Sequence, residues 1–172
     1  MTPLVLTLIG DDKPGLVNAA AQAVAAHGGT WLESRAARLS GKFAGIVSIG
    51  APEAQVEALT AALRQLESAG LKVAVERGAD APPASAARRL EIEIVGHERP
   101  GIVRDLTQTL MSLGANIEEF SSGVESAPFT GAEMFRAQIR VGLPEALSPS
   151  DVRRTLEKLA GEIMVDLTLG DE

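Results

Sequence analysis

The chain has 172 residues, of which 45% are hydrophobic and 3% aromatic, so it is long enough for one medium domain or two small domains with an aliphatic core. Its formal net charge of -7 argues against non-specific binding of nucleic acid, which depends on Lys and Arg neutralising phosphates. The absence of cysteine excludes disulfides, thiol catalysis and thiolate zinc sites. Because no signal peptide and no long apolar span are evident, we expect a cytoplasmic protein that does not cross a membrane.

Six elements are predicted in the first half of the chain. Apolar residues alternate over 4–8, as in a strand with one buried face, and recur at helical spacing over 16–24. Gly28-Gly29 ends that helix, and strands are expected at 30–39 and 43–49. The apolar positions of the next helix and of a last strand are Val56, Leu59, Leu63 and Leu66, and then Leu71, Val73 and Val75.

The same elements recur from Leu90 onward. The segment "LEIEIVGHERPGIVRDL" repeats "LVLTLIGDDKPGLVNAA", and after six extra residues within 122–134 the match resumes. This order is improbable by chance and indicates the duplication of one unit of about 75 to 80 residues. We expect 122–134 to be a hairpin loop that is either a simple insertion or a partner-binding feature. The first expected elements are a strand at 90–94, a helix over 102–113, a strand from about 116 to 122 or slightly beyond, and a strand at 134–141. They are followed by a helix that begins near Ser148 and carries Val152, Leu156 and Leu159, and by a strand at 163–169.

The element order in each copy predicts the fold class α+β. Strand, helix, strand, strand, helix, strand is the ferredoxin-like βαββαβ arrangement, an antiparallel four-stranded sheet with two helices on one face. The predicted domains are 1–77 and 90–172, joined by a linker at 78–89 that is rich in Ala, Pro and Ser. Glu91 and Glu93 stand where the first copy has Val5 and Thr7. We therefore expect the open sheet faces to differ, with the first copy's face better suited to burial.

Each copy joins its first strand to its first helix through Gly, a charged pair, a variable residue and Pro-Gly. The strand-end Gly admits close approach of a ligand, Asp11 or Asp12 can cap the helix, and the free N–H groups at the helix start suit a carboxylate or another small anion. The same residues equally suit a tight turn that serves folding alone. The Lys-Ser/Thr ending of a P-loop and the dinucleotide fingerprint are both absent from these loops.

The remaining polar residues indicate no catalytic site. His97 and Glu98 are only two adjacent metal ligands, and Ser121-Ser122 lies on an expected strand without a triad partner. The acid pairs Asp11-Asp12 and Glu118-Glu119 favour capping and solvation over acid–base catalysis. We therefore expect no catalytic residue, no metal site and no cofactor.

The motif strand-G-x-x-[KR]-P-G-[LI]-V-helix, followed by G-[AG]-[NT]-[IW]-x-E, resembles the ACT domain. The tandem layout is similar to the glycine cleavage system transcriptional repressor family. In ACT proteins an amino acid often binds between two units, against the first loop, the helix start and the start of the second strand. The residues that the resemblance implies as ligand contacts are Gly10, Asp11, Asp12, Pro14, Gly15, Leu16 and Thr30, and then Gly96, His97, Glu98, Pro100, Gly101, Ile102 and Asn116.

The second copy is the preferred site of the two. Asn116 matches the Asn that is common in the family at that point, whereas Thr30 departs from it. In the expected arrangement, backbone N–H groups at Gly101-Ile102 bind the carboxylate, Asn116 adds a side-chain hydrogen bond, and Glu98 or Asp12 accepts from the ammonium.

The resemblance implies a non-enzymatic regulator that senses a small amino acid such as glycine. It would restrain transcription by contacting a DNA-binding activator protein, without touching nucleic acid itself. The alternative is a regulatory subunit or binding module that controls an amino-acid or one-carbon metabolic enzyme in trans. Two such units pair within one chain or across a homodimer, and the sequence leaves this choice open.

Overall fold

The computed structural model describes residues 1–79, 88–126 and 131–171. It divides into two compact units, Met1–Pro83 and Ala84–Glu172. Most of the expected linker at 78–89 lies outside the described residues.

Within the described residues, each unit contains four strands and two α-helices. The elements of the first unit are β1 (Thr2–Asp11), α1 (Leu16–Ala26), β2 (Thr30–Leu39), β3 (Lys42–Ala51), α2 (Val56–Gln65) and β4 (Leu71–Arg77), with 3₁₀ turns at Glu53–Gln55 and Leu66–Ala69 on either side of α2. Those of the second unit are β5 (Arg89–His97), α3 (Ile102–Ser112), β6 (Asn116–Ser126), β7 (Glu133–Gly142), α4 (Pro149–Ile163) and β8 (Val165–Asp171).

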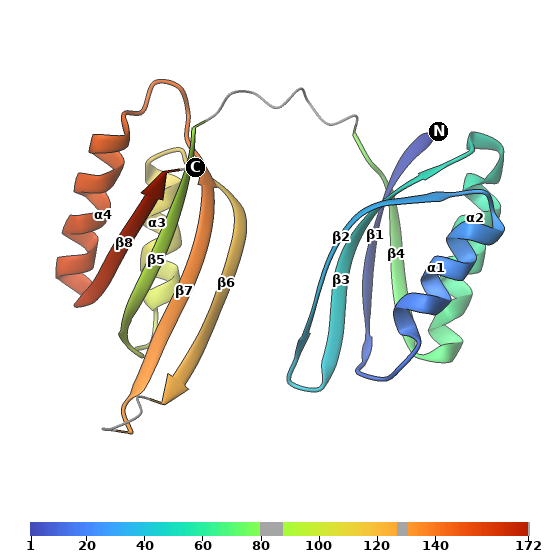
Figure 1. Ribbon diagram of the computed structural model, residues 1–172, viewed down its shortest axis with the longest axis horizontal. Helices are drawn as coiled ribbons and strands as arrows, with labels where there is room; N and C mark the ends of the chain where they lie inside the picture. The colour runs from blue at the N-terminus through green and yellow to red at the C-terminus, as the bar shows by residue number, and fades with distance from the viewer. Residues whose placement is uncertain (80–87, 127–130, 172) are drawn as a thin grey trace. The chain divides into compact units, whose positions relative to one another are not determined.

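The strand order is β2-β3-β1-β4 in one sheet and β6-β7-β5-β8 in the other, and all neighbours are antiparallel. In each unit both helices lie on the same side of the sheet (Figure 1). The predicted α+β class, with two ferredoxin-like βαββαβ units in tandem, is therefore confirmed.

The core of each unit lies between its sheet and its two helices. Leu4, Leu6 and Leu8 are buried because alternate strand residues face the same side, and they meet the apolar stripe of the helices. The second unit repeats this arrangement, with Ile92 in β5 and Leu106 in α3. Within the described residues, no helix has both the length and the apolar character needed to cross a membrane.

Two expected element boundaries are wrong. Ile163 is the last residue of α4 rather than part of a strand, because the left-handed Met164 ends the helix and β8 begins only at Val165. Much of the expected loop at 122–134 is paired strand, since the β6–β7 ladder continues to the pair Ser126↔Glu133. Residues 127–130 of that segment lie outside the described part of the chain.

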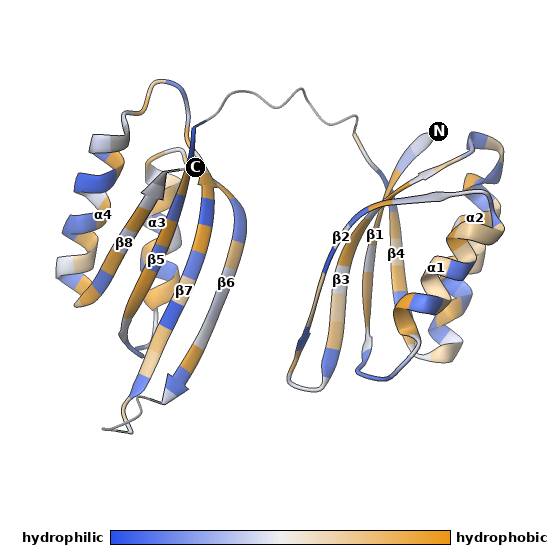
Figure 2. Cartoon of the chain, in the orientation of Figure 1, coloured by the Kyte–Doolittle hydropathy of each residue, from blue (hydrophilic) through white to orange (hydrophobic). Residues whose placement is uncertain are grey.

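The open sheet faces differ between the units, as predicted. Figure 2 shows hydrophilic and hydrophobic residues alternating along β5 and β7, whereas β1 and β3 carry few hydrophilic residues. The expected burial of the first unit's face stays a prediction.

Candidate functional site

The loops that follow β1 and β5 end in a glycine that starts the helix. Gly15 and Gly101 occupy the N-cap positions of α1 and α3 with φ of 94° and 88°, a left-handed conformation that favours glycine. Neither helix has a side-chain cap hydrogen bond. The expectation that Asp11 or Asp12 caps α1 is therefore wrong. Asp11 instead pairs with Lys42, and Asp12 lies 3.2 Å from Arg38.

The strand-end glycines of the motif are required by packing. A Cβ on Gly10 would overlap the carbonyl oxygen of Gly70, and a Cβ on Gly96 would overlap the side chain of Val165. Glycine at both positions thus allows the start of the neighbouring strand to pack closely. This packing explains the two glycines without the close approach of a ligand that was expected.

The first residue of each of these helices is buried, whereas the next one, Val17 or Val103, is exposed. Leu16 and Ile102 are the first residues of α1 and α3, and their side chains are buried in the two cores. The first N–H groups of a helix lack acceptors within the helix and carry partial positive charge. The Ile102 N–H already donates to the carbonyl oxygen of Arg99, at 3.4 Å, so a ligand at Ile102 would replace this bond and would not meet the buried side chain. Pro14 and Pro100 lie in the turns just before Gly15 and Gly101.

A hollow of about 280 Å³ opens beside the start of α3. The loop and helix contribute Glu98, Arg99, Gly101, Ile102 and Val103 to it, and the strands contribute Ser122, Gly123, Val124 and Phe135. The loop thus faces the carboxyl end of β6. Sequence reasoning missed these β6 residues, although the antiparallel order of a βαββαβ unit places the end of its second strand beside the end of its first.

The charge at this hollow is organised by Asp105, in the first turn of α3. Its carboxylate lies 2.8 Å from Arg99 and 2.8 Å from Arg104. The hydrogen bond from Arg99, followed by that from Arg104, lowers the pKa of Asp105 below its usual value. The two guanidinium groups are matched by two carboxylates, those of Asp105 and of Glu98, which borders the same hollow. The Arg104 guanidinium lies over Gly101, where an added Cβ would come within 3.1 Å of its Nη2 atom.

The strand-start residues lie at the far end of each sheet. Val124 of β6 pairs with Phe135 of β7, and Phe135 pairs with Gly96 of β5. The end of β6 therefore lies level with the loop between β5 and α3. Asn116 lies eight residues earlier on β6, about 26 Å away at about 3.3 Å per residue. Thr30, opposite Gly50 and Pro3, is equally remote from the loop after β1. Within one unit, the structure does not bring Asn116 or Thr30 to the predicted ligand loop.

His97 and Glu98 line different hollows. His97 ends β5, opposite Met134, and borders a hollow of about 640 Å³ together with Glu157 and Met164. Glu98 borders the smaller hollow beside α3. His97 therefore shares its hollow with Gly96, whereas the predicted residues Glu98, Gly101 and Ile102 line the other one.

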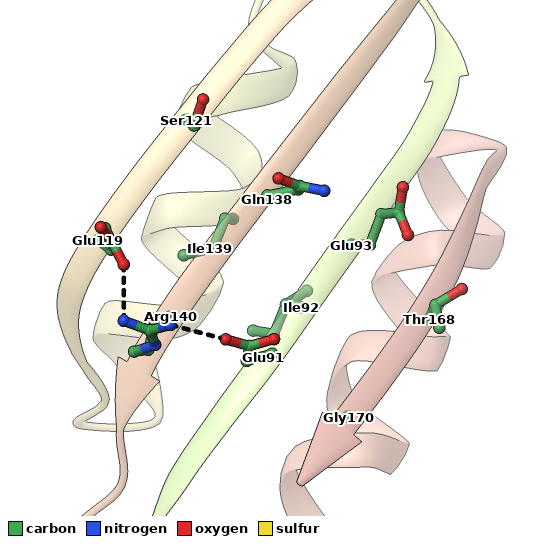
Figure 3. A pocket seen from close by; sticks show the side chains of 10 residues that line it. All are labelled: Glu91, Ile92, Glu93, Glu119, Ser121, Gln138, Ile139, Arg140, Thr168 and Gly170. Carbon is green, nitrogen blue, oxygen red and sulfur yellow. Dashed lines mark hydrogen bonds and ion pairs between the residues drawn. The ribbon is translucent and has the colours of Figure 1, made fainter. Parts of the chain in front are cut away.

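The open face of the second unit carries a further hollow of about 440 Å³. Figure 3 shows Arg140 of β7 between Glu119 of β6 and Glu91 of β5, at 2.7 and 2.9 Å respectively. Arg136 pairs with Glu93 on the same face. In these cross-strand pairs the opposite charges neutralise each other, and the side chains remain partly exposed to water. Such a face is stable in contact with water and does not need to be buried. In the described ranges, no group of three or more His, Asp or Glu side chains is placed to hold a metal ion.

Comparison with known proteins identifies the class. Residues 2–76 match the family model of the ACT domain. The first unit therefore belongs to the ACT domain family, and the second repeats its strand order, so the chain is a tandem protein of ACT fold.

Individual relatives cover nearly the whole chain. Over 98% of its length the chain is 28% identical to the phosphoserine phosphatase SerB2 of Mycobacterium tuberculosis, and it spans only 40% of that relative. A solved structure of an unknown protein from Galdieria sulphuraria is 29% identical with a TM-score of 0.87, covering 99% of this chain and 98% of that one. A candidate glycine cleavage system transcriptional repressor, 17% identical, has a TM-score of 0.74 and covers 99% of this chain and 97% of that one, which shows the shared fold.

Proposed function

We propose that the chain is a non-enzymatic regulator that binds a small amino acid beside the loop between β5 and α3. The observation that carries this proposal is the hollow of about 280 Å³, where the α3 start, Glu98 and the end of β6 meet. Drug-sized ligands occupy pockets of about 300 to 1,000 Å³, so this hollow suits a smaller molecule.

The chemistry of the hollow fits an amino-acid zwitterion. The partial positive charge of the α3 start at Gly101-Ile102 and the neighbouring Arg104 attract a carboxylate, which takes the Ile102 N–H from the carbonyl oxygen of Arg99. Glu98 accepts from an ammonium. Asn116 lies too far away to complete this site from the same unit.

The regulator acts through a protein partner in this proposal. One partner class is a DNA-binding activator, as the name of the candidate repressor of similar fold suggests. The other class is an enzyme of amino-acid metabolism controlled in trans. The similarity of almost the whole chain to part of a phosphoserine phosphatase supports this second class. Affinity purification from native lysate, with and without the amino acid that binds, distinguishes them by the protein that is recovered.

Isothermal titration with glycine, serine and the branched amino acids tests the ligand proposal. We expect one of them to bind, and Glu98→Gln to weaken binding about tenfold because the ammonium loses its charged acceptor. Asp12→Asn, the matched change in the first unit, should leave the affinity unchanged. Failure of every amino acid to bind would refute the proposal, and sensitivity to Asp12→Asn alone would move the site to the first loop.

A further inference from the structure

We infer that the open sheet face of the first unit is the interface of a symmetric homodimer, in which it packs against the same face of a second copy of the chain. This inference does not depend on amino-acid binding. It rests on the contrast between the open faces of two units with the same fold and on the order of charges along the first.

The open face of the first unit is apolar at its centre. Outward positions of β1, β3 and β4 carry Val5, Thr7, Ile9, Ala44, Ile46 and Ala74. Ile9 is 47% exposed and Ile46 is 53% exposed, so both stand in water when the face is uncovered. A contiguous apolar patch of this kind marks an interaction surface on a soluble protein.

The second unit provides an internal comparison. Its register places Glu91 at the position of Val5, Gln138 at the position of Ile46, and Arg140 at the position of Ser48. The same backbone therefore tolerates a largely polar, ion-paired face, although Val95 stands at the position of Ile9. The fold of the sheet therefore does not require the apolar residues that the first unit carries at the positions of Glu91 and Gln138.

The order of residues on the first face makes it complementary to itself. The row of residues across the sheet that lies two positions before Thr7 contains Val5 and Glu76. The row that lies two positions after Thr7 contains Ile9 and Lys72. A twofold axis that lies across the strands at Thr7 exchanges these rows, so Val5 meets Ile9 of the second copy and Glu76 meets its Lys72. Antiparallel sheets packed face to face in this way keep their strands nearly aligned.

The surface details agree with this pairing. A hollow of about 210 Å³, lined in part by Val5, Ile46 and Ser48, lies where Ile9 of the second copy would enter. Lys72 is loosely held, 3.8 Å from Glu67, and can turn toward a new partner. Arg35 lies in the same row as Thr7, so the twofold axis places it opposite Arg35 of the second copy. In each chain Glu33, 3.3 Å away, compensates the charge of Arg35.

The size of the face predicts a weak dimer. Four strands about 4.8 Å apart and a length of about 23 Å give about 450 Å² on each copy, or about 900 Å² in all. This value lies just below the area of about 1,000 Å² that stable interfaces exceed, so the dimer should dissociate on dilution.

Sedimentation velocity of the full chain from about 5 to about 500 μM tests the inference. We expect a shift from the 17.9 kDa monomer toward a dimer over this range. Ile46→Gln, which introduces the residue of the second unit, should weaken the dimer about tenfold or more. The matched control Gln138→Ala on the second unit's face should change nothing.

A charge exchange tests the symmetry. Lys72→Glu and Glu76→Lys should each weaken the dimer several-fold, because each places like charges opposite one another, and the double variant should restore it. Circular dichroism verifies that every variant is folded. A wild-type chain that stays monomeric throughout, a dimer insensitive to Ile46→Gln, a dimer lost in Gln138→Ala, or a double variant without recovery would each overturn the inference.

Discussion

Met164 adopts a left-handed backbone conformation, with φ of 53° and ψ of 56°, at the end of α4. The equivalent residue of the first unit, Gly70, has φ of 87°. A non-glycine residue in this conformation costs about 1 to 2 kcal/mol, and the Met164 side chain is 81% exposed, so its packing returns little. The two units thus form the same turn with different residues, glycine in the first and methionine in the second, and glycine adopts this conformation at a lower cost.

We therefore predict that Met164→Gly stabilises the second unit by about 0.5 to 1 kcal/mol, after subtraction of the greater entropy that glycine gives the unfolded chain. Urea denaturation measures this change in the free energy of unfolding. Gly70→Ala is the control and should destabilise, since an added Cβ is strained there and lies 3.1 Å from Lys13 Nζ. A loss of stability in Met164→Gly would show that the side chain contributes more than the backbone costs.

At the scale of elements, a surface cluster links the segment after β3 to the end of β4. Glu53 lies 2.7 Å from Arg77 and also accepts from Thr2 of β1. The hydrogen bond from Arg77, and then that from Thr2, lowers the pKa of Glu53 to about 2. A carboxyl group with a lowered pKa in the folded state stabilises the protein above its unfolded pKa, near 4.5, and this contribution disappears as the pH falls toward 2.

We predict that Glu53→Gln lowers Tm slightly at about pH 6 and that the difference from wild type vanishes as the pH approaches about 2. Thermal denaturation across this range measures it. In an Arg77→Gln background, the same substitution should have much less pH-dependent effect, because the principal cause of the lowered pKa has been removed. An unchanged pH dependence in that background would assign the effect to another group.

At the scale of the whole molecule, each unit has its own hydrophobic core. The two clusters of buried side chains share no residue, and each draws only on the elements of its own unit. Trp31, the single tryptophan of the chain, packs against the first core and therefore reports on that unit alone.

We predict that Leu90→Ala lowers the stability of the second unit by about 2 to 5 kcal/mol and leaves the tryptophan unfolding transition unchanged. Leu4→Ala, at the equivalent buried position, should shift the tryptophan transition by a similar amount. Urea titrations followed by fluorescence and by far-ultraviolet circular dichroism compare the two. A tryptophan transition that moves in Leu90→Ala would show that the units unfold together.

Much of this architecture could be predicted from local patterns. Alternation at Leu4, Leu6 and Leu8 and helical spacing from Ile102 to Leu110 identify the face that each element buries, because these periods depend only on neighbouring residues. The boundary at Ile163 could not be predicted, since an apolar residue suits the end of a buried helix as well as the start of a strand. The cap of α1 was assigned wrongly to Asp11 or Asp12, because Gly15 acts through its backbone conformation and not through a side chain, as Gly101 does in α3.

By itself, the sequence determined the duplication, the βαββαβ order of both units, the sides that their strands bury and the contrast between Glu91 and Val5 on the open faces. Only the tertiary structure decided what surrounds the ligand loop. It placed Val124 rather than Asn116 level with Gly96, with Phe135 between them, and it put His97 and Glu98 at different hollows. The physical reason is that a hydrophobic period fixes which side of its own strand a residue faces, whereas the lateral neighbours of that residue depend on the register between strands that are distant in the chain.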